Sequence, residues 1–119
     1  MREVKAAAVQ MRCVSDAASN LQTAERLIRQ AAAEGAQIIL LPELFERPYF
    51  CQERQYGYYQ YAQPAEENAA VARLSALARE LRVVLPVSFY ERDGNCLYNS
   101  AAILDADGSL LGVYRKTHI

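Results

Sequence analysis

The sequence lacks any apolar run close to the roughly 20 residues that cross a bilayer. Its N-terminal residues are not followed by the long apolar region and cleavage site of a signal peptide, so we expect no secretory leader. An excess of charge of one sign is also missing, because 13 basic residues are balanced by 14 acidic residues and leave a net charge of −1. This balance gives no reason to expect a nucleic acid or a membrane surface as a partner.

Cysteine and histidine are scarce in this sequence. The three cysteines, Cys13, Cys51 and Cys96, are odd in number and far apart, so they fit neither a disulfide framework nor a zinc-binding pattern. This usage favours the reducing cytoplasm. His118 is the single histidine and has no second metal ligand or catalytic partner in sight, which favours a structural role. We expect no metal and no organic cofactor.

The residues that are present indicate one globular domain. Of the 119 residues, 52% are hydrophobic and 23% are charged, which is an ordinary globular balance. No internal repeat, low-complexity segment or linker interrupts the chain. The whole length is therefore expected to fold around one core.

The segment 37–45 organises the chain. Residues 38–41 form an unbroken apolar run that predicts a strand buried on both faces, and Pro42 ends it because proline cannot donate to a ladder. Glu43 follows at the carboxyl end of this strand, where open α/β sheets place their chemistry. Its apolar neighbours would raise the pKa of the carboxyl and suit it to proton transfer. A solvated loop glutamate is the alternative interpretation.

The order of the elements predicts an α/β fold. The apolar segment 4–11 predicts the first strand, and an apolar stripe predicts a helix that ends at Gly35. This helix begins either at a capping box formed by Ser19 and Gln22 or earlier, near Asp16. The strand over 37–41 follows directly. Strand, helix and strand with short links predict a β-α-β unit with parallel strands and a right-handed crossover.

The second half of the chain predicts one helix and three strands. Glu66 and Glu67 indicate the start of a helix that ends near Arg82, because acidic residues stabilise the first helical turn. Three strands are expected after it, over 83–90, 97–104 and 110–114. Pro86 conflicts with the first of these and requires a bulge or an unpaired edge. The complete pattern predicts a mixed sheet with helices on one face.

A long loop between residues 47 and 64 is rich in aromatic residues. Its tyrosines are Tyr49, Tyr56, Tyr58, Tyr59 and Tyr61. A loop of this length is usually functional or disordered, and the aromatic content argues against disorder. The rings suit a pocket for an alkyl chain that carries a cation. They suit a sealed core or a subunit contact equally well, and both interpretations remain open.

Lys116 lies at the exit of the last predicted strand. We expect its side chain to meet Glu43 at the carboxyl ends of adjacent strands. In such a pair the lysine would stabilise a developing oxyanion while the glutamate moves protons. A solvated basic end formed by Arg115 and Lys116 is the alternative, and it is the simpler one from residue type alone.

Two motifs carry a resemblance that covers nearly the whole chain. Leu41-Pro42-Glu43-Leu44-Phe45 and Tyr114-Arg115-Lys116-Thr117-His118, in this order, resemble the nitrilase superfamily of carbon–nitrogen hydrolases. Two further segments fit the same pattern, at 35–39 and 98–101. A closer similarity, to the N-carbamoylputrescine amidases, rests on the segments 43–46, 49–52 and 87–91.

The resemblance implies part of a four-layer αββα sandwich with a Glu-Lys-Cys catalytic set. Glu43 matches the general base, and Lys116 matches the lysine that stabilises the tetrahedral intermediate. The nucleophilic cysteine of the family follows the lysine, so no cysteine of this chain occupies its place. Residues 1–119 are therefore expected to be the N-terminal portion of one hydrolase domain, truncated before the nucleophile.

The resemblance also implies a reaction for the complete protein, which is hydrolysis of N-carbamoylputrescine to putrescine, ammonia and carbon dioxide by a homo-oligomer. Tyr49 is the loop aromatic nearest to Glu43, so we expect it to border the pocket for this small carbamoyl amine. Residues 1–119 alone are expected to be inactive and poorly stable. The alternatives are another amide, carbamoyl or nitrile substrate on the same fold, and a non-catalytic half-domain.

Overall fold

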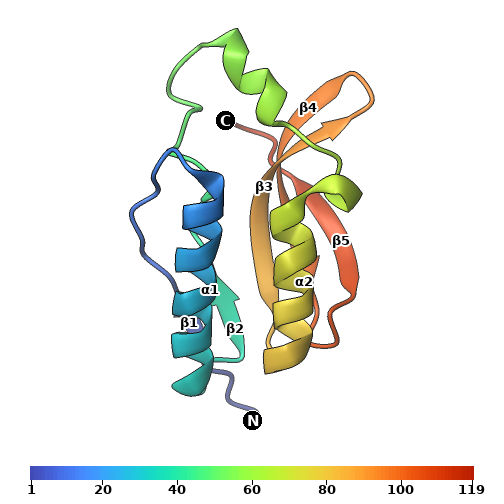
Figure 1. The fold of residues 1–119 in the computed structure, drawn as a ribbon. Coiled ribbons are helices and arrows are strands. Elements are labelled where there is room, and N and C mark those ends of the chain that lie inside the picture. The colour runs from blue at the N-terminus through green and yellow to red at the C-terminus, as the bar shows by residue number, and fades with distance from the viewer.

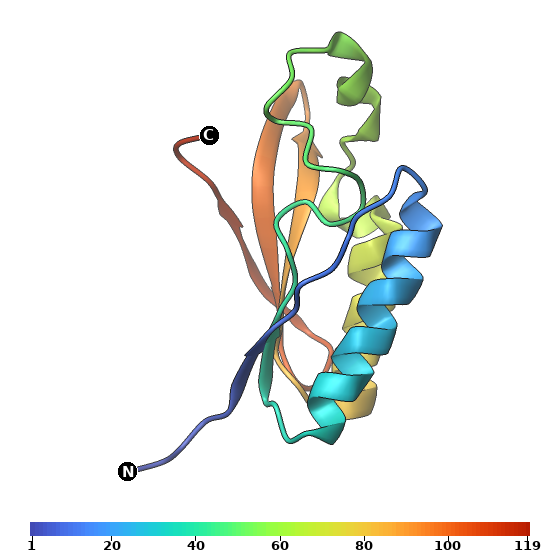
Figure 2. The ribbon, with the colours of Figure 1, turned by 90° about the vertical axis from the view of Figure 1, so that its left-hand side faces the viewer.

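The computed structural model describes every residue from Met1 to Ile119. A layer of strands is covered on one face by two helices that lie side by side (Figures 1 and 2). In chain order the elements are β1 (Ala6–Ala8), α1 (Ala17–Ala33), β2 (Ile38–Leu40), the 3₁₀ helices η1 (Tyr56–Tyr61) and η2 (Ala65–Glu67), α2 (Ala69–Leu81), β3 (Leu85–Asp93), β4 (Cys96–Leu104) and β5 (Leu110–Arg115). The predicted mixed α/β order is confirmed.

The strands follow one another across the sheet in sequence order. β1 and β2 pair in parallel, and β3, β4 and β5 form an antiparallel meander. A parallel bridge between Ile38 and Val84 joins the two groups. Because β4 alone runs in the opposite direction, β2, β3 and β5 end at the same edge of the sheet. This edge holds the residues that follow β2 and β5, which include Glu43 and Lys116.

Pro86 lies inside β3 without a bulge, opposite Ile103 in an uninterrupted register with β4. The backbone of the preceding Val84 exchanges hydrogen bonds with Gln37 and Ile39 on the β2 side. Backbone groups alternate between the two edges of a strand, so the missing N–H of Pro86 falls on this same side. Of the two predicted solutions, the unpaired edge is the one present.

α1 begins after Asp16, the earlier of the two predicted starts, and not at a Ser19 capping box, while α2 ends where predicted but starts later. Gly35 follows the C-cap of α1 with φ of +94°, a conformation that glycine adopts without strain. Asn68 caps α2 by accepting a hydrogen bond from the Val71 amide at 2.9 Å. The prediction that Glu66 and Glu67 start this helix was wrong, because both lie in η2, before the cap.

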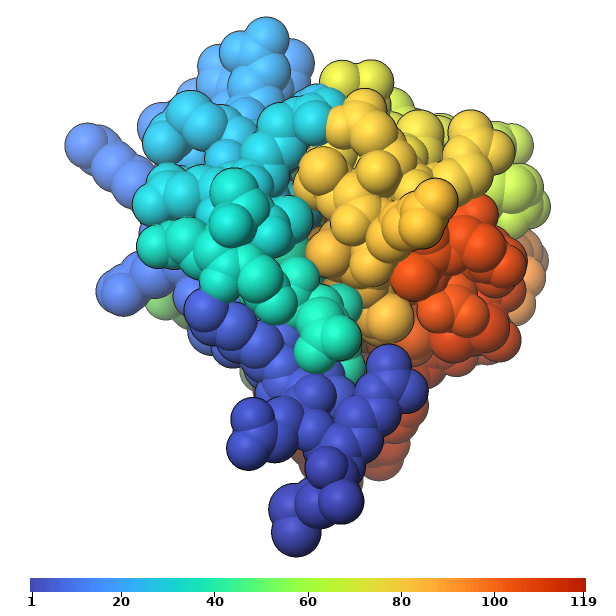
Figure 3. All heavy atoms as spheres, turned by 90° about the horizontal axis from the view of Figure 1, so that it is seen from below, coloured from blue at the N-terminus to red at the C-terminus, as the bar shows by residue number.

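The core lies between the two helices and one face of the sheet. Fully buried side chains from both layers meet there, among them Ile28 of α1, Leu74 of α2, Ile39 of β2 and Phe89 of β3. In Figure 3, the ends of α1 (cyan) and α2 (gold) lie against each other, while the N-terminal residues (dark blue) project on the other side. The helices therefore cover one sheet face only.

The opposite face of β2 is open to solvent. Ile38 is 38% exposed and Leu40 is 51% exposed, whereas Ile39 between them is fully buried. Burial of this strand on both faces stays a prediction for the complete domain, because two helices cover only one face of the sheet in residues 1–119. The apolar run reflects two faces that both suit burial, but this chain supplies helices for one of them.

Two leucine-to-alanine substitutions distinguish the covered face from the open one. Leu74→Ala should lower the free energy of unfolding by roughly 2–5 kcal/mol, because it leaves a cavity in the core. Leu40→Ala should change it by no more than about 0.5 kcal/mol, since half of that side chain is already in water. Urea unfolding of both variants of residues 1–119, at a protein concentration low enough to keep the segment monomeric, measures the difference, and equal losses would show that the open face is packed in solution.

Candidate active site

A strained turn directly after β2 presents Glu43. Leu44 has a φ of +52°, which is uncommon for a residue with a branched side chain. Its backbone N–H donates to the Ser88 hydroxyl of β3 at 2.8 Å, and its side chain is buried next to Phe45. These contacts fix the turn, so Glu43 is held at the sheet edge with 41% of its side chain exposed.

Lys116 reaches Glu43 from the end of β5. Its backbone N–H donates to the Asn99 carbonyl at 2.8 Å, and its Nζ donates to Oε1 of Glu43 at 2.8 Å. The structure thus brings the two predicted side chains together at the predicted edge. They do not come from adjacent strands, as we expected, because β3 and β4 lie between β2 and β5.

Asn99 of β4 completes this group and was given no role from the sequence. Its side-chain amide is buried and donates to Oε1 of Glu43 at 2.6 Å. The available signal was an asparagine in the middle of a strand of small and apolar residues, where asparagine is uncommon and a buried amide needs a partner. No pattern in the sequence indicated that the partner is Glu43.

The ion pair changes the acidity of both members. The hydrogen bond from Lys116 is the main cause that lowers the pKa of Glu43, and the hydrogen bond from Asn99 adds to it, while burial opposes them. The pKa of Lys116 is raised, chiefly by its hydrogen bond to Glu43. The prediction that apolar neighbours raise the pKa of Glu43 was therefore wrong. Both groups are charged at neutral pH.

Arg115 fixes the residue that precedes Lys116. Its guanidinium donates to both carboxylate oxygens of the buried Glu91, from Nε at 2.8 Å and from Nη2 at 2.9 Å. Ser100 donates to the same carboxylate, and the ring of Tyr98 lies 4.0 Å from the Arg115 guanidinium carbon. Both basic residues thus have specific partners, which disfavours the alternative of a solvated basic end.

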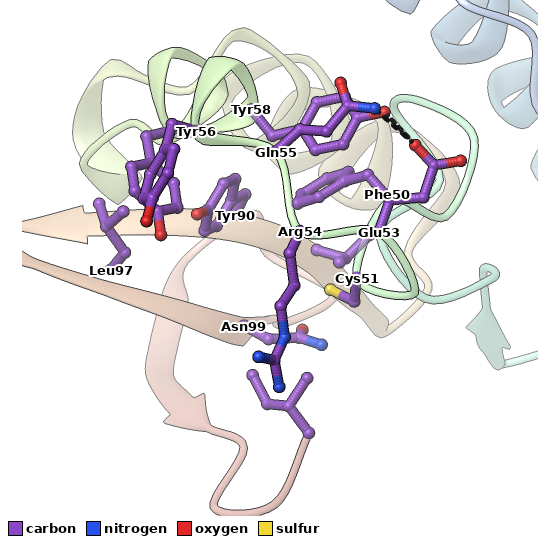
Figure 4. A pocket seen from close by; sticks show the side chains of 13 residues that line it. Phe50, Cys51, Glu53, Arg54, Gln55, Tyr56, Tyr58, Tyr90, Leu97 and Asn99 are labelled. Carbon is purple, nitrogen blue, oxygen red and sulfur yellow. Dashed lines mark hydrogen bonds between the residues drawn. The ribbon is translucent and has the colours of Figure 1, made fainter.

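A cavity of about 460 Å³ lies beside this site, between the loop after β2 and the ends of β3 and β4 (Figure 4). It reaches the candidate site through Asn99. Its lining is mainly aromatic and apolar and consists of Leu44, Phe50, Cys51, Glu53, Arg54, Gln55, Tyr56, Tyr58, Tyr59, Tyr90, Leu97, Asn99 and Ile119. Three of the five loop tyrosines, Tyr56, Tyr58 and Tyr59, therefore line this larger cavity, which favours the pocket interpretation.

Tyr49 lies apart from this cavity but near the ion pair. It lines a smaller neighbouring cavity of about 220 Å³ and is 39% exposed. Burial is the largest cause that raises the pKa of its phenol, and the charges of Cys51 and Glu43 raise it further. Tyr49 thus borders the site on the loop side without contacting the larger cavity.

The cysteines lie outside the Glu43–Lys116 contact. Cys13, Cys51 and Cys96 are all free, and burial raises the pKa of the Cys13 thiol. Cys51 lines the aromatic cavity, and Cys96 is exposed on β4. No set of three or more histidine, cysteine, aspartate or glutamate side chains is grouped so that it could hold a metal ion. No helix is both long enough and apolar enough to span a membrane.

Comparison with known proteins places this geometry in a family. Residues 5–119 match the carbon-nitrogen hydrolase family. The chain is 51% identical to an N-carbamoylputrescine amidase of Oryza sativa subsp. japonica over 98% of this chain and 39% of that protein. It is 47% identical to a citrullinase of Francisella tularensis over 100% of this chain and 42% of that protein.

The fold also matches a solved structure. A carbon-nitrogen hydrolase from Helicobacter pylori G27 superposes with a TM-score of 0.88 and 30% sequence identity, over 98% of this chain and 40% of that one. The chain thus spans about two fifths of the length of the relatives that it matches. With the Glu43–Lys116 pair at the sheet edge and the family match over residues 5–119, the chain belongs to the carbon–nitrogen hydrolases of the nitrilase superfamily.

Proposed function

We propose that this chain supplies the general base and the oxyanion-stabilising lysine of an amidohydrolase that cleaves N-carbamoylputrescine. The observation that carries the proposal is the ion pair between Lys116 and Glu43, 2.8 Å apart, beside an aromatic cavity. The rice relative, named an N-carbamoylputrescine amidase, supports the choice of substrate. Residues 1–119 form the N-terminal portion of the domain, and the nucleophilic cysteine lies on the remainder of the protein.

The first half of the reaction uses both residues. Glu43, ionised in its ion pair, takes the proton of the cysteine thiol while the sulfur attacks the ureido carbonyl. Lys116 stabilises the negative charge that develops on the carbonyl oxygen. Glu43 then gives the proton to the departing nitrogen, and ammonia leaves a carbamoyl group on the sulfur.

The second half releases the product. Glu43 takes a proton from water, which attacks the carbamoyl group, and returns this proton to the cysteine sulfur. The carbamic acid that forms loses carbon dioxide and becomes putrescine. The reaction needs no metal and no organic cofactor, because every proton is moved by Glu43.

The cavity suits the remainder of this substrate. Its aromatic walls, which include Phe50, Tyr56 and Tyr90, provide an apolar surface for a four-carbon chain. Glu53 is the one carboxylate among the lining residues, and it already accepts a hydrogen bond from Tyr58 at 2.9 Å. A carboxylate with aromatic faces around it favours a ligand that ends in an ammonium group.

A ureido amino acid is the second candidate substrate. The relative from Francisella tularensis, named a citrullinase, favours it. Arg54 lines the same cavity and makes no hydrogen bond or ion pair within the chain, so its guanidinium is free to bind a substrate carboxylate. Comparing kcat/KM for N-carbamoylputrescine and citrulline decides between the two substrates.

We further propose a cellular location and an assembly state for the complete enzyme. Three free cysteines support a reducing cytoplasm. The open apolar face of β2, with Leu40 51% exposed, supports further covering by the rest of the domain. We propose a homo-oligomer on the family resemblance alone.

Glu43→Gln in the complete enzyme should preserve the fold and abolish most turnover, because glutamine keeps the shape and loses the base. Loss of one positioned general base costs on the order of a hundred- to ten-thousand-fold in rate. Ammonia release from N-carbamoylputrescine measures the effect. Glu67→Gln, at an exposed position in η2, is the matched control and should leave the rate unchanged. Near-normal turnover by Glu43→Gln would assign the base to another group.

Tyr49→Ala in the complete enzyme should reduce kcat/KM for N-carbamoylputrescine more than for a neutral carbamoyl analogue of similar length. The expected cause is loss of an aromatic face beside Glu53, because Tyr49 and Glu53 line the same smaller cavity, and Tyr49→Phe, which keeps the ring, should retain most of the activity. Steady-state kinetics on both substrates measures the ratio. Equal losses for the two substrates would show that the ring only packs.

Residues 1–119 alone should release no ammonia from N-carbamoylputrescine, since Glu43 and Lys116 without the nucleophile cannot form the covalent intermediate. The isolated segment should also aggregate, because the open face carries exposed Ile38 and Leu40. Parallel expression of 1–119 and the complete protein, with light scattering and an ammonia assay, tests both statements. Hydrolysis by 1–119 alone would make Cys51 the candidate nucleophile.

A further inference from the structure

The two carboxylate oxygens of Glu43 have different surroundings. Oε1 accepts two hydrogen bonds, from Nδ2 of Asn99 at 2.6 Å and from Nζ of Lys116 at 2.8 Å. Oε2 accepts none from any residue of the chain. A carboxylate has lone pairs for about four donors. Both donors nevertheless contact Oε1, because the positions of Asn99 and Lys116 bring them to that oxygen.

The position of Asn99 is fixed by burial and by hydrogen bonds. It lies in the middle of β4, opposite Tyr90 of β3, and its side chain is buried. Its carbonyl accepts the backbone N–H of Lys116, so one residue contacts the glutamate through its side chain and the lysine through its backbone. A shift of Asn99 would therefore displace both members of the pair.

The inference rests on the proposed function. We infer that Asn99 is a positioning residue that, together with Lys116, holds Oε1 of Glu43 and leaves Oε2 as the oxygen that takes and returns the proton. Asn99 does not touch the reacting atoms and acts through Glu43.

This arrangement accommodates both protonation states of the carboxyl group. When the lone pair of Oε2 takes the thiol proton, the S–H bond breaks and an O–H bond forms, and the charge moves to the sulfur. Oε1 is then a carbonyl oxygen and continues to accept from Asn99 and Lys116. At the same moment Lys116 loses its anionic partner, so its charge becomes available to the oxyanion that the thiolate attack creates.

The other groups around Glu43 define its electrostatic environment. Lys116 comes from the end of β5, and Tyr49 comes from the loop after β2. Cys51, in the same loop, is close enough to affect the pKa of both Tyr49 and Lys116. Asn99 is the only neutral donor to the carboxylate, which makes its contribution separable from that of the ion pair.

The test compares Asn99→Ala and the uncharged, similarly branched Asn99→Leu with Asn95→Ala in the complete enzyme. Asn95 lies in the exposed turn between β3 and β4, so it is a control on the same hairpin. Carbon-13 NMR of glutamate carboxyl groups follows the titration of Glu43, with the signal assigned through Glu43→Gln. The steady-state rates with N-carbamoylputrescine are measured across the same pH range.

Asn99→Ala and Asn99→Leu should both raise the pKa of Glu43, because the charged form loses a hydrogen bond and gains no new charge beside it, and should move the acidic limb of kcat/KM to higher pH. Misplacement of the carboxylate should lower kcat roughly 10- to 100-fold. Asn95→Ala should change neither quantity. Asn99→Leu keeps a side chain branched at the same position without a donor or a charge, and keeps the test decisive if Asn99→Ala does not fold.

An unchanged titration of Glu43 in both Asn99 variants would overturn the inference, and so would an unchanged kcat. The titration needs no substrate, so it remains informative if the enzyme does not hydrolyse carbamoyl amines. If the enzyme hydrolyses no carbamoyl amine, the proposed function fails. A raised pKa of Glu43 in the Asn99 variants would still show that Asn99 holds the carboxylate.

Discussion

The common direction of β2, β3 and β5 is the constraint on which the candidate site depends. Glu43 and Lys116 are 73 positions apart in the sequence, and their contact exists because both strands end at one edge of the sheet. The parallel bridge between Ile38 and Val84 and the two antiparallel pairings of β4 fix this direction. If β5 paired directly with β3 in antiparallel orientation, without β4 between them, β5 would end at the opposite edge of the sheet and Lys116 would lie there.

Stability does not explain the residues at this edge. The side chains of Glu43 and Lys116 are 41% and 39% exposed, and ion pairs this accessible to water contribute little net stability. The left-handed Leu44 and the buried amide of Asn99 are both unfavourable unless they have specific partners, which Ser88 and Glu43 provide. These contacts orient the Glu43 carboxylate. The stability of the fold comes mainly from the apolar core between the helices and the sheet.

Local patterns in the sequence predicted the elements of the fold, and long-range contacts account for the errors. Gly35 was correctly placed at the end of α1, because the backbone preference of glycine is local. The pKa of Glu43 was predicted in the wrong direction, because its local apolar neighbours were given more weight than the distant partner Lys116, although that contact was expected. Asn99 received no role for the same reason, since an isolated asparagine does not identify the side chain that it contacts across two strands. The burial of Leu40 stays a prediction for the complete domain, because apolar composition shows that a face suits burial without showing what covers it.

A double-mutant cycle on Glu43 and Lys116 tests most directly whether the two residues act as one catalytic unit. Glu43→Gln, Lys116→Met and the double variant would be compared by kcat/KM in the complete enzyme. The structure predicts strong non-additivity, so that the double variant is about as slow as the slower single variant. Losses that multiply, as for two independent residues, would contradict the account.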